Sequence, residues 1–160
     1  MTLVFIILFG VLLTEASAQG TDDYIRQKVL QKSVIGRLFV FGKWNENGGT
    51  ETHLRYLGKV ITRKGHTYKI VNSIWIWGLS RRATSRVLIF NDRNQYIGNY
   101  YLTLVTDLPT QLKNGKLIFK NTDINCDKKQ VTLVDFRNGI PKQFFRKCNG
   151  SGDIYVFDSN

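Results

Sequence analysis

Residues 70–104 read IVNSIWIWGLSRRATSRVLIFNDRNQYIGNYYLTL, and this stretch decides the fold. Apolar and β-branched residues gather in runs that clusters of Gly, Ser, Arg, Asn and Asp interrupt. Such runs, bounded by turn residues, are typical of β-strands. We therefore expect strands over residues 67–77, 86–91 and 96–105, with a loop over 79–85 and a turn at 92–95.

Strand alternation gives the first of these strands two faces. Ile70, Ile74 and Ile76 share one face, which we expect to belong to the core. Trp75 and Trp77 share the other. Large aromatic side chains are mostly buried, so we expect this face to be buried as well. An exposed aromatic platform is the alternative that the sequence leaves open.

The rest of the chain continues the pattern of short strands. Residues 36–44 and 54–62 read as strands, and 54–62 forms a hairpin with 67–77 across residues 63–65. Residues 21–32 (TDDYIRQKVLQK) read as the one helix, with acids in its first turn and lysines in its last. The sequence thus predicts a mainly β domain, an antiparallel barrel or sandwich with one short N-terminal helix.

The C-terminal third predicts a meander. Asn138-Gly139 separates VTLVDF (131–136) from IPKQFF (140–145), and Asn-Gly between apolar runs is typical of a two-residue hairpin turn. In that register Asp135 faces Lys142. A second turn at 149–152 returns the chain through DIYVF.

The chain contains two cysteines, Cys126 and Cys148. The predicted hairpin brings both to its open end, and an even count in an exported protein favours a disulfide. No C-x-x-C occurs, and neither cysteine has a neighbouring histidine, so we expect no metal site and no cofactor.

The first residues predict export. Residues 3–13 form an apolar run that ends at Ala16-Ser17-Ala18, which fits a signal peptide cleaved after Ala18. As a helix the run spans only about 16 Å, too short for a bilayer core of about 30 Å. We expect a secreted or periplasmic protein with a single β-rich domain over 19–160 and no membrane span after cleavage. Cleavage removes one acid and no base, which raises the net charge from +11 to +12.

The basic residues are concentrated in one block. Residues 52–91 contain eight Arg or Lys and no Asp or Glu, with tyrosines and tryptophans between them. Arginine forks suit phosphate and carboxylate groups, and aromatic rings add stacking. A solvated basic face is the plainer interpretation. The candidate binding residues are Arg81, Arg82, Arg86, Trp75, Trp77 and Lys69.

We therefore expect a non-catalytic binding module for an anionic or glycan partner. A small secreted hydrolase or nuclease is the alternative, and a structural component of an envelope is a third. No nucleophile motif is present. The predicted hairpin places His53 and His66 about 26 Å apart, so we assign no catalytic residue.

Overall fold

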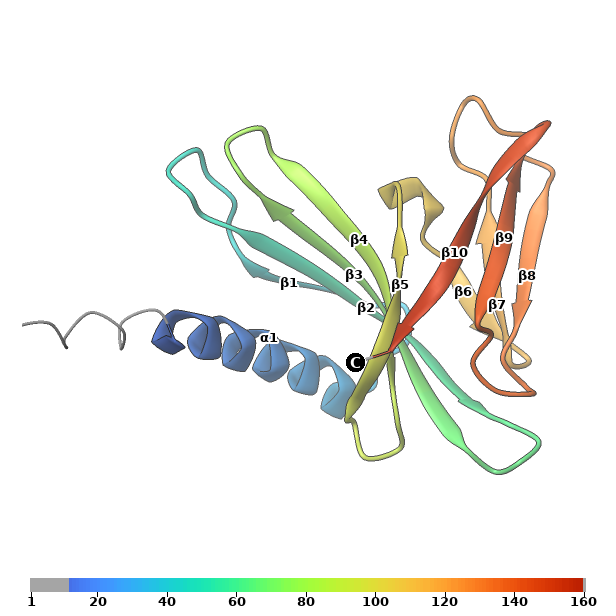
Figure 1. Cartoon of the computed structure of the whole chain (residues 1–160), viewed down its shortest axis with the longest axis horizontal. Coiled ribbons are helices and arrows are strands. Elements are labelled where there is room, and N and C mark those ends of the chain that lie inside the picture. The colour runs from blue at the N-terminus through green and yellow to red at the C-terminus, as the bar shows by residue number, and fades with distance from the viewer. Residues whose placement is uncertain (1–11, 160) are drawn as a thin grey trace, which may run out of the picture.

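The computed structural model describes residues 12–159, which form one long helix, ten strands and a single 3₁₀ turn (Figure 1). The elements are α1 (Leu12–Lys32), β1 (Leu38–Gly42), β2 (Glu51–Ile61), β3 (Thr67–Trp77), β4 (Arg82–Phe90), β5 (Tyr96–Leu102), η1 (Val105–Asp107), β6 (Gln111–Lys113), β7 (Lys116–Lys120), β8 (Val131–Asp135), β9 (Gln143–Cys148) and β10 (Ser151–Ser159).

The strands form two antiparallel sheets. The large sheet has the order β1-β2-β3-β4-β5-β10-β9, and the small sheet has the order β6-β7-β8. Side chains from both sheets share one core, so the arrangement resembles a sandwich and the sheets do not close into a barrel. We call the face of the large sheet that carries this core the inner face, and the opposite face the outer face. The predicted mainly β fold is confirmed.

The meander from β2 to β5 follows the sequence prediction closely. β3 spans Thr67–Trp77, as its alternation predicts, and pairs with β2 and β4 along its length. β4 begins at Arg82, four residues before the predicted start at residue 86. The cause is the turn, which needs only residues 78–81: Gly78 and Arg81 both adopt positive φ, and the Arg81 amide donates to the Gly78 carbonyl.

The predicted hairpin between residues 131–136 and 140–145 is wrong. β8 pairs with β7, and β9 pairs with β10. The local turn forms, since the Gly139 amide donates to the Phe136 carbonyl, but the chain then crosses from the small sheet to the large one. Phe136 and Phe144 are both buried in the shared core, one from each side of this crossing. β8 and β9 therefore lie in two facing sheets and do not pair with each other in one sheet.

The expected pair between Asp135 and Lys142 is absent for the same reason. Asp135 instead accepts hydrogen bonds from the Arg137 side chain at 2.6–3.0 Å. These bonds lower the pKa of Asp135 to about 2.

The hairpin at the C-terminus forms as expected. Cys148 pairs with Ser151 across Asn149-Gly150, and Asn149 has the positive φ that asparagine tolerates. β10 then runs on to pair with β5 through its last residues, so this strand lies between β5 and β9 in the large sheet.

Helix α1 covers part of the outer face. Ile25, Val29 and Leu30 are buried there against β2, β3 and β4, as the helical pattern predicts, whereas Tyr24 is exposed. The helix begins at Leu12, upstream of the predicted start, and continues past Ala18. Residues 1–11 of the predicted signal peptide lie outside the described residues. No helix in the described part of the chain has the length and apolar character needed to cross a membrane.

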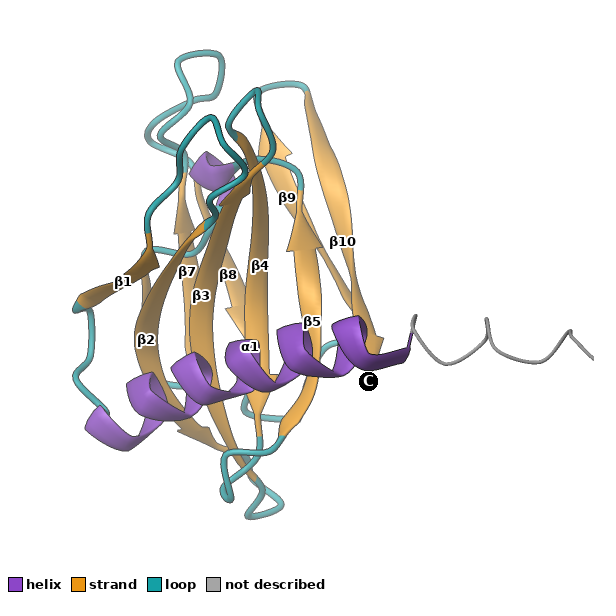
Figure 2. Ribbon diagram, turned by 90° about the vertical axis from the view of Figure 1, so that its left-hand side faces the viewer, coloured by secondary structure: helices purple, strands orange, loops and turns teal. Residues whose placement is uncertain are grey.

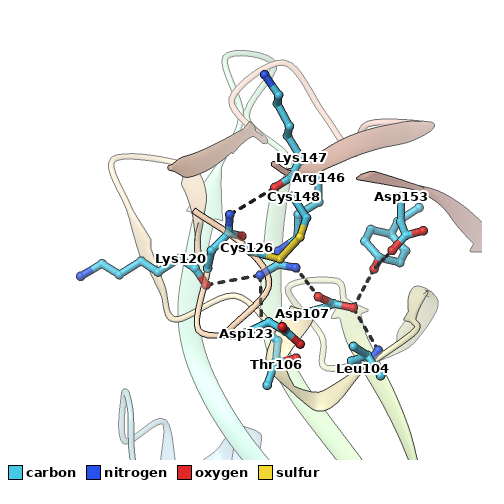
Figure 3. Close-up of polar contacts among 12 residues, drawn as sticks. Leu104, Thr106, Asp107, Lys120, Asp123, Cys126, Arg146, Lys147, Cys148 and Asp153 are labelled. Carbon is cyan, nitrogen blue, oxygen red and sulfur yellow. Dashed lines mark hydrogen bonds and ion pairs between the residues drawn. A yellow bond between two sulfur atoms is a disulfide. The ribbon is translucent and has the colours of Figure 1, made fainter. Parts of the chain in front are cut away.

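The disulfide between Cys126 and Cys148 is confirmed (Figure 3). It joins the loop between β7 and β8 to the end of β9, so it links the small sheet to the large sheet. The predicted pair is therefore right, although it does not close a hairpin.

A buried polar network lies beside the disulfide (Figure 3). Arg146 and Asp107 form an ion pair, with both residues at most 5% exposed. The Tyr155 hydroxyl donates to Asp107 at 2.9 Å, and the Leu104 amide donates to the same carboxylate at 3.0 Å. These contacts fix η1 and the segment that follows it against the large sheet.

Candidate binding face

The outer face of the large sheet is only partly covered by the helix. Figure 2 shows α1 lying across the lower ends of β2–β5, which leaves the upper parts of β3 and β4 without a helix over them. The helix packs on Val71 and Leu88, whereas Trp75 and Trp77 lie further along the same face. Trp75 is 42% exposed and Trp77 is half-buried, so the expected burial of this face is wrong and the exposed platform is observed.

The two tryptophans form one continuous aromatic surface. Their ring centroids are 5.4 Å apart and the ring planes differ by 20°. The Trp77 indole N–H donates to the Thr84 hydroxyl at 3.1 Å. Trp75 has Thr52 and Thr84 as its cross-strand neighbours, and these short side chains leave the Trp75 ring open to solvent.

Two arginines lie on tryptophan rings beside this surface. Arg82 pairs with Trp77 across the strands, and its guanidinium lies 5.7 Å from the Trp77 ring centroid. Arg81 lies 5.4 Å from the ring of Trp44. A guanidinium that rests face-on against a ring keeps its N–H donors at the edge, where they can bind an anion.

Trp44 was not among the candidate residues. Its indole N–H donates to the Gly78 carbonyl at 2.9 Å, which ties the loop after β1 to the turn between β3 and β4. The sequence held one signal, a tryptophan at the end of a predicted strand next to the turn at 45–50. Only the fold shows that the loop after β1 meets the turn at residues 78–81, which carries Arg81.

The backbone of Arg81 is unusual. Its φ is 50°, in the left-handed region, where the other non-glycine residues are three asparagines and one serine among the described residues. Asparagine tolerates this region, whereas a long side chain costs roughly 1–2 kcal/mol there. Arginine therefore stands at a position that glycine or asparagine would suit better for folding.

Arg86 lies on the same face, closer to the helix. It pairs with Ser73 on one side and Tyr101 on the other. Tyr101 is 57% exposed, so it extends the aromatic surface toward β5, which the sequence did not indicate. We call Trp44, Trp75, Trp77, Arg81, Arg82 and Arg86 the Arg–Trp face.

Lys69 is not part of the Arg–Trp face. It lies near the other end of β3, eight residues from Trp77, which corresponds to roughly 26 Å along a strand. Its ammonium donates to the Asp92 carbonyl at 3.1 Å and to the Asn94 side chain. The structure therefore brings the three arginines and two tryptophans of the predicted site together and separates the lysine from them.

The charge on this face is not neutralised by neighbouring acids. Among the described residues, no carboxylate lies within ion-pair distance of Arg81, Arg82 or Arg86. Glu51 is near Arg81, but its carboxylate already contacts His53 and the Trp44 amide. Those bonds, the one from His53 above all, lower the pKa of Glu51. The face is thus a cationic aromatic surface with free donors.

The two histidines stay apart in the structure. His53 pairs with Ile74 in the upper half of the β2–β3 hairpin, whereas His66 lies at its turn. Within residues 12–159, no three His, Cys, Asp or Glu side chains are grouped so that they could hold a metal ion.

Comparison of the chain with protein-family models, with curated proteins and with solved structures finds no match.

Proposed function

We propose that this protein is an exported binding protein for an acidic polysaccharide, which it holds on the Arg–Trp face. The observation that carries the proposal is the pairing of arginine with tryptophan in two places around a stacked tryptophan pair in which Trp75 is exposed. A net charge of +11 adds long-range attraction for a polyanion.

The two kinds of side chain suit the two parts of a sugar acid. The flat Trp75 surface offers apolar area to the C–H face of a sugar ring, because apolar area removed from water is favourable. Arg82 and Arg86 lie on the neighbouring strand, where their forks can receive carboxylate or sulfate oxygens. A polymer that repeats ring and acid along its length meets both features at once.

Single-stranded nucleic acid is the main competitor, since bases also stack on exposed rings. A sheet face with one broad stacking surface and unpaired arginines would accept either polymer at low salt. Competition between heparin and a single-stranded oligonucleotide of equal charge, with binding measured at rising salt, separates the two. Preferential and more salt-resistant binding of heparin is expected.

The test compares matched charge removals. Arg81, Arg82 and Arg86 are changed together to Gln, and the control changes Lys59, Arg63 and Lys64 to Gln. Each variant loses three charges, but the control residues lie toward the other end of β2 and in the turn after it. Exposed ion pairs contribute roughly 0.2–1 kcal/mol each, so the first variant should bind heparin about 3- to 150-fold more weakly.

Trp75→Ala adds a test of stacking. It should weaken binding of heparin with no change in charge, because the stacked surface is lost. Equal loss of binding in both triple variants, with full binding by the tryptophan variant, would show that only net charge matters and would refute the assigned face.

The hydrolase or nuclease alternative makes a different prediction. The contact of His53 with Glu51 lies on the inner face of the sheet, and Glu51 also accepts a hydrogen bond from the Trp44 amide. Degradation of RNA, DNA or glycan by the purified protein, abolished in His53→Gln or His66→Ala, would favour that alternative.

A further inference from the structure

A concave surface lies on the inner face of the large sheet, on the side opposite the Arg–Trp face. It is a cleft of about 260 Å³ between β1–β3 and the segment that runs from η1 to the start of β6. Leu38 and Ile74 line it from the sheet, and Val105, Leu108 and Pro109 line it from the segment. The cleft therefore has two apolar walls.

The segment from η1 to the start of β6, which forms one wall of the cleft, is held in place by the buried network around Asp107. Asp107 lies within the segment and binds Arg146, Tyr155 and the Leu104 amide. A wall anchored by a buried ion pair keeps its shape without a ligand, and preformed shape is what small-molecule sites require.

Asn72 ties the two walls of the cleft together. The residue is 7% exposed, and its Nδ2 donates to the Pro109 carbonyl at 2.8 Å. This bond joins β3 to the segment that forms the opposite wall. The Oδ1 atom of Asn72 is buried and has no hydrogen-bond partner among the described residues, so it takes no part in binding a ligand in the cleft.

Two further polar groups line the same cleft. None of the ion pairs among the described residues involves Arg55, which pairs with Asn72 across the strands. His53 lies next to it along the same face and contacts Glu51. The cleft thus offers one free cation and two apolar walls.

We infer that this cleft binds a small organic acid with a short apolar body. The acid group meets Arg55, and the body lies between Ile74 and Pro109. A water molecule occupies roughly 30 Å³ in the liquid, so the volume of the cleft corresponds to about nine groups of that size. The site is separate from the Arg–Trp face, because Asn72 and Ile74 point to the opposite side of β3 from Trp75.

The experiment titrates the full-length protein with small acids and follows its backbone and side-chain amides by heteronuclear NMR. The probes are butyrate, β-hydroxybutyrate, benzoate and para-hydroxybenzoate, each with its primary amide as a neutral control. We expect saturable shifts at Arg55, Asn72 and Ile74 with the acids. Their amides should bind about tenfold more weakly, the loss that follows from removing one charge-assisted hydrogen bond.

Two variants make the assignment specific. Arg55→Gln should weaken binding of the acids by about tenfold, since it removes the cation that receives them. Lys59→Gln removes the same charge from the same strand on its other face, and it should bind the acids as the wild type does. Trp75→Ala should also leave acid binding unchanged, which separates this site from the proposed polysaccharide face.

Three outcomes would overturn the inference. The first is that no acid in the panel binds more tightly than its amide. The second is that Arg55→Gln binds the acids as well as the wild type. The third is that Lys59→Gln loses as much affinity as Arg55→Gln, which would mean that general charge attraction explains the shifts.

Discussion

Arg81→Gly is the substitution that best separates folding from binding. At a φ of 50°, arginine costs roughly 1–2 kcal/mol that glycine does not. Against this, glycine adds about 0.5–1 kcal/mol of entropy to the unfolded chain. It also loses the exposed contact with the Trp44 ring, worth about 0.5–1 kcal/mol. The opposing contributions nearly cancel, so the free energy of unfolding should change by less than about 1 kcal/mol.

Binding of heparin should respond differently. One exposed charge pair contributes about 0.2–1 kcal/mol, so Arg81→Gly should bind heparin about 1.4- to five-fold more weakly. Urea unfolding followed by tryptophan fluorescence measures stability, and isothermal titration calorimetry with heparin at constant salt measures affinity. The expected result is a clear loss of affinity with an almost unchanged urea midpoint.

Arg81→Asn is the matched variant, because asparagine also tolerates the left-handed region and also lacks the charge. It should match Arg81→Gly in both measurements. If both variants bind heparin like the wild type, Arg81 does not contact the polymer. If both unfold at markedly lower urea concentrations, the arginine backbone is not the source of strain that its φ indicates.

Four other predictions concern stability. Reduction of the protein, or the double change of Cys126 and Cys148 to Ser, should lower the free energy of unfolding by about 3 kcal/mol for a separation of 22 residues, as measured by urea unfolding with and without reductant. Asp107→Asn should cost about 3–5 kcal/mol, because it leaves its arginine partner charged and buried, and the urea midpoint reports this. Burial, ahead of hydrogen bonding, raises the pKa of Tyr155 to about 12. Because the tyrosine ionises first in the unfolded chain, the free energy of unfolding should fall between about pH 10 and pH 12. Tyr155→Phe should remove that part of the pH dependence. Asp135 has the opposite sign: its lowered pKa of about 2 means that stability should fall as pH drops from about 4 to 2, and Asp135→Asn should flatten that decline in acid unfolding curves.

The part of the fold that the sequence predicts well is the part set by local chemistry. The β2–β3 hairpin needs only alternation along two strands and a turn at Arg63-Lys64-Gly65, all of which can be read from adjacent residues. The turn at Asn149-Gly150 is of the same kind. Boundaries and pairings of such hairpins follow from the residues that form them.

The hairpin expected after β8 fails because pairing there is decided by tertiary packing. The residues at 138–139 do form a turn, so the local signal is correct. Phe136 and Phe144 are apolar residues that either arrangement could bury, and the sequence contains nothing that separates pairing within a sheet from a crossing between sheets. The order of strands in two facing layers is a property of the whole core.

The exposure of Trp75 has a similar origin. Alternation correctly assigns Trp75 and Trp77 to one face of β3, but it cannot say how far along that face the helix extends. α1 packs on Val71 and ends its coverage before Trp75. The burial of a strand residue depends on which element covers it, and no residue pattern indicates the path of the helix over the sheet.

The fold distributes the basic residues of the stretch 52–91 between the two faces of the large sheet, which the net charge alone does not indicate. Arg55 and Arg86 lie on neighbouring strands of β3, yet alternation sends one to the inner face and the other to the outer face. The inner arginine meets a cleft with two apolar walls, and the outer one meets exposed aromatic rings. A basic face that served solubility alone would need neither neighbour, since solvated charges require only water. The partners that the fold gives these arginines therefore argue for binding, and for two different ligands on the two sides of one sheet.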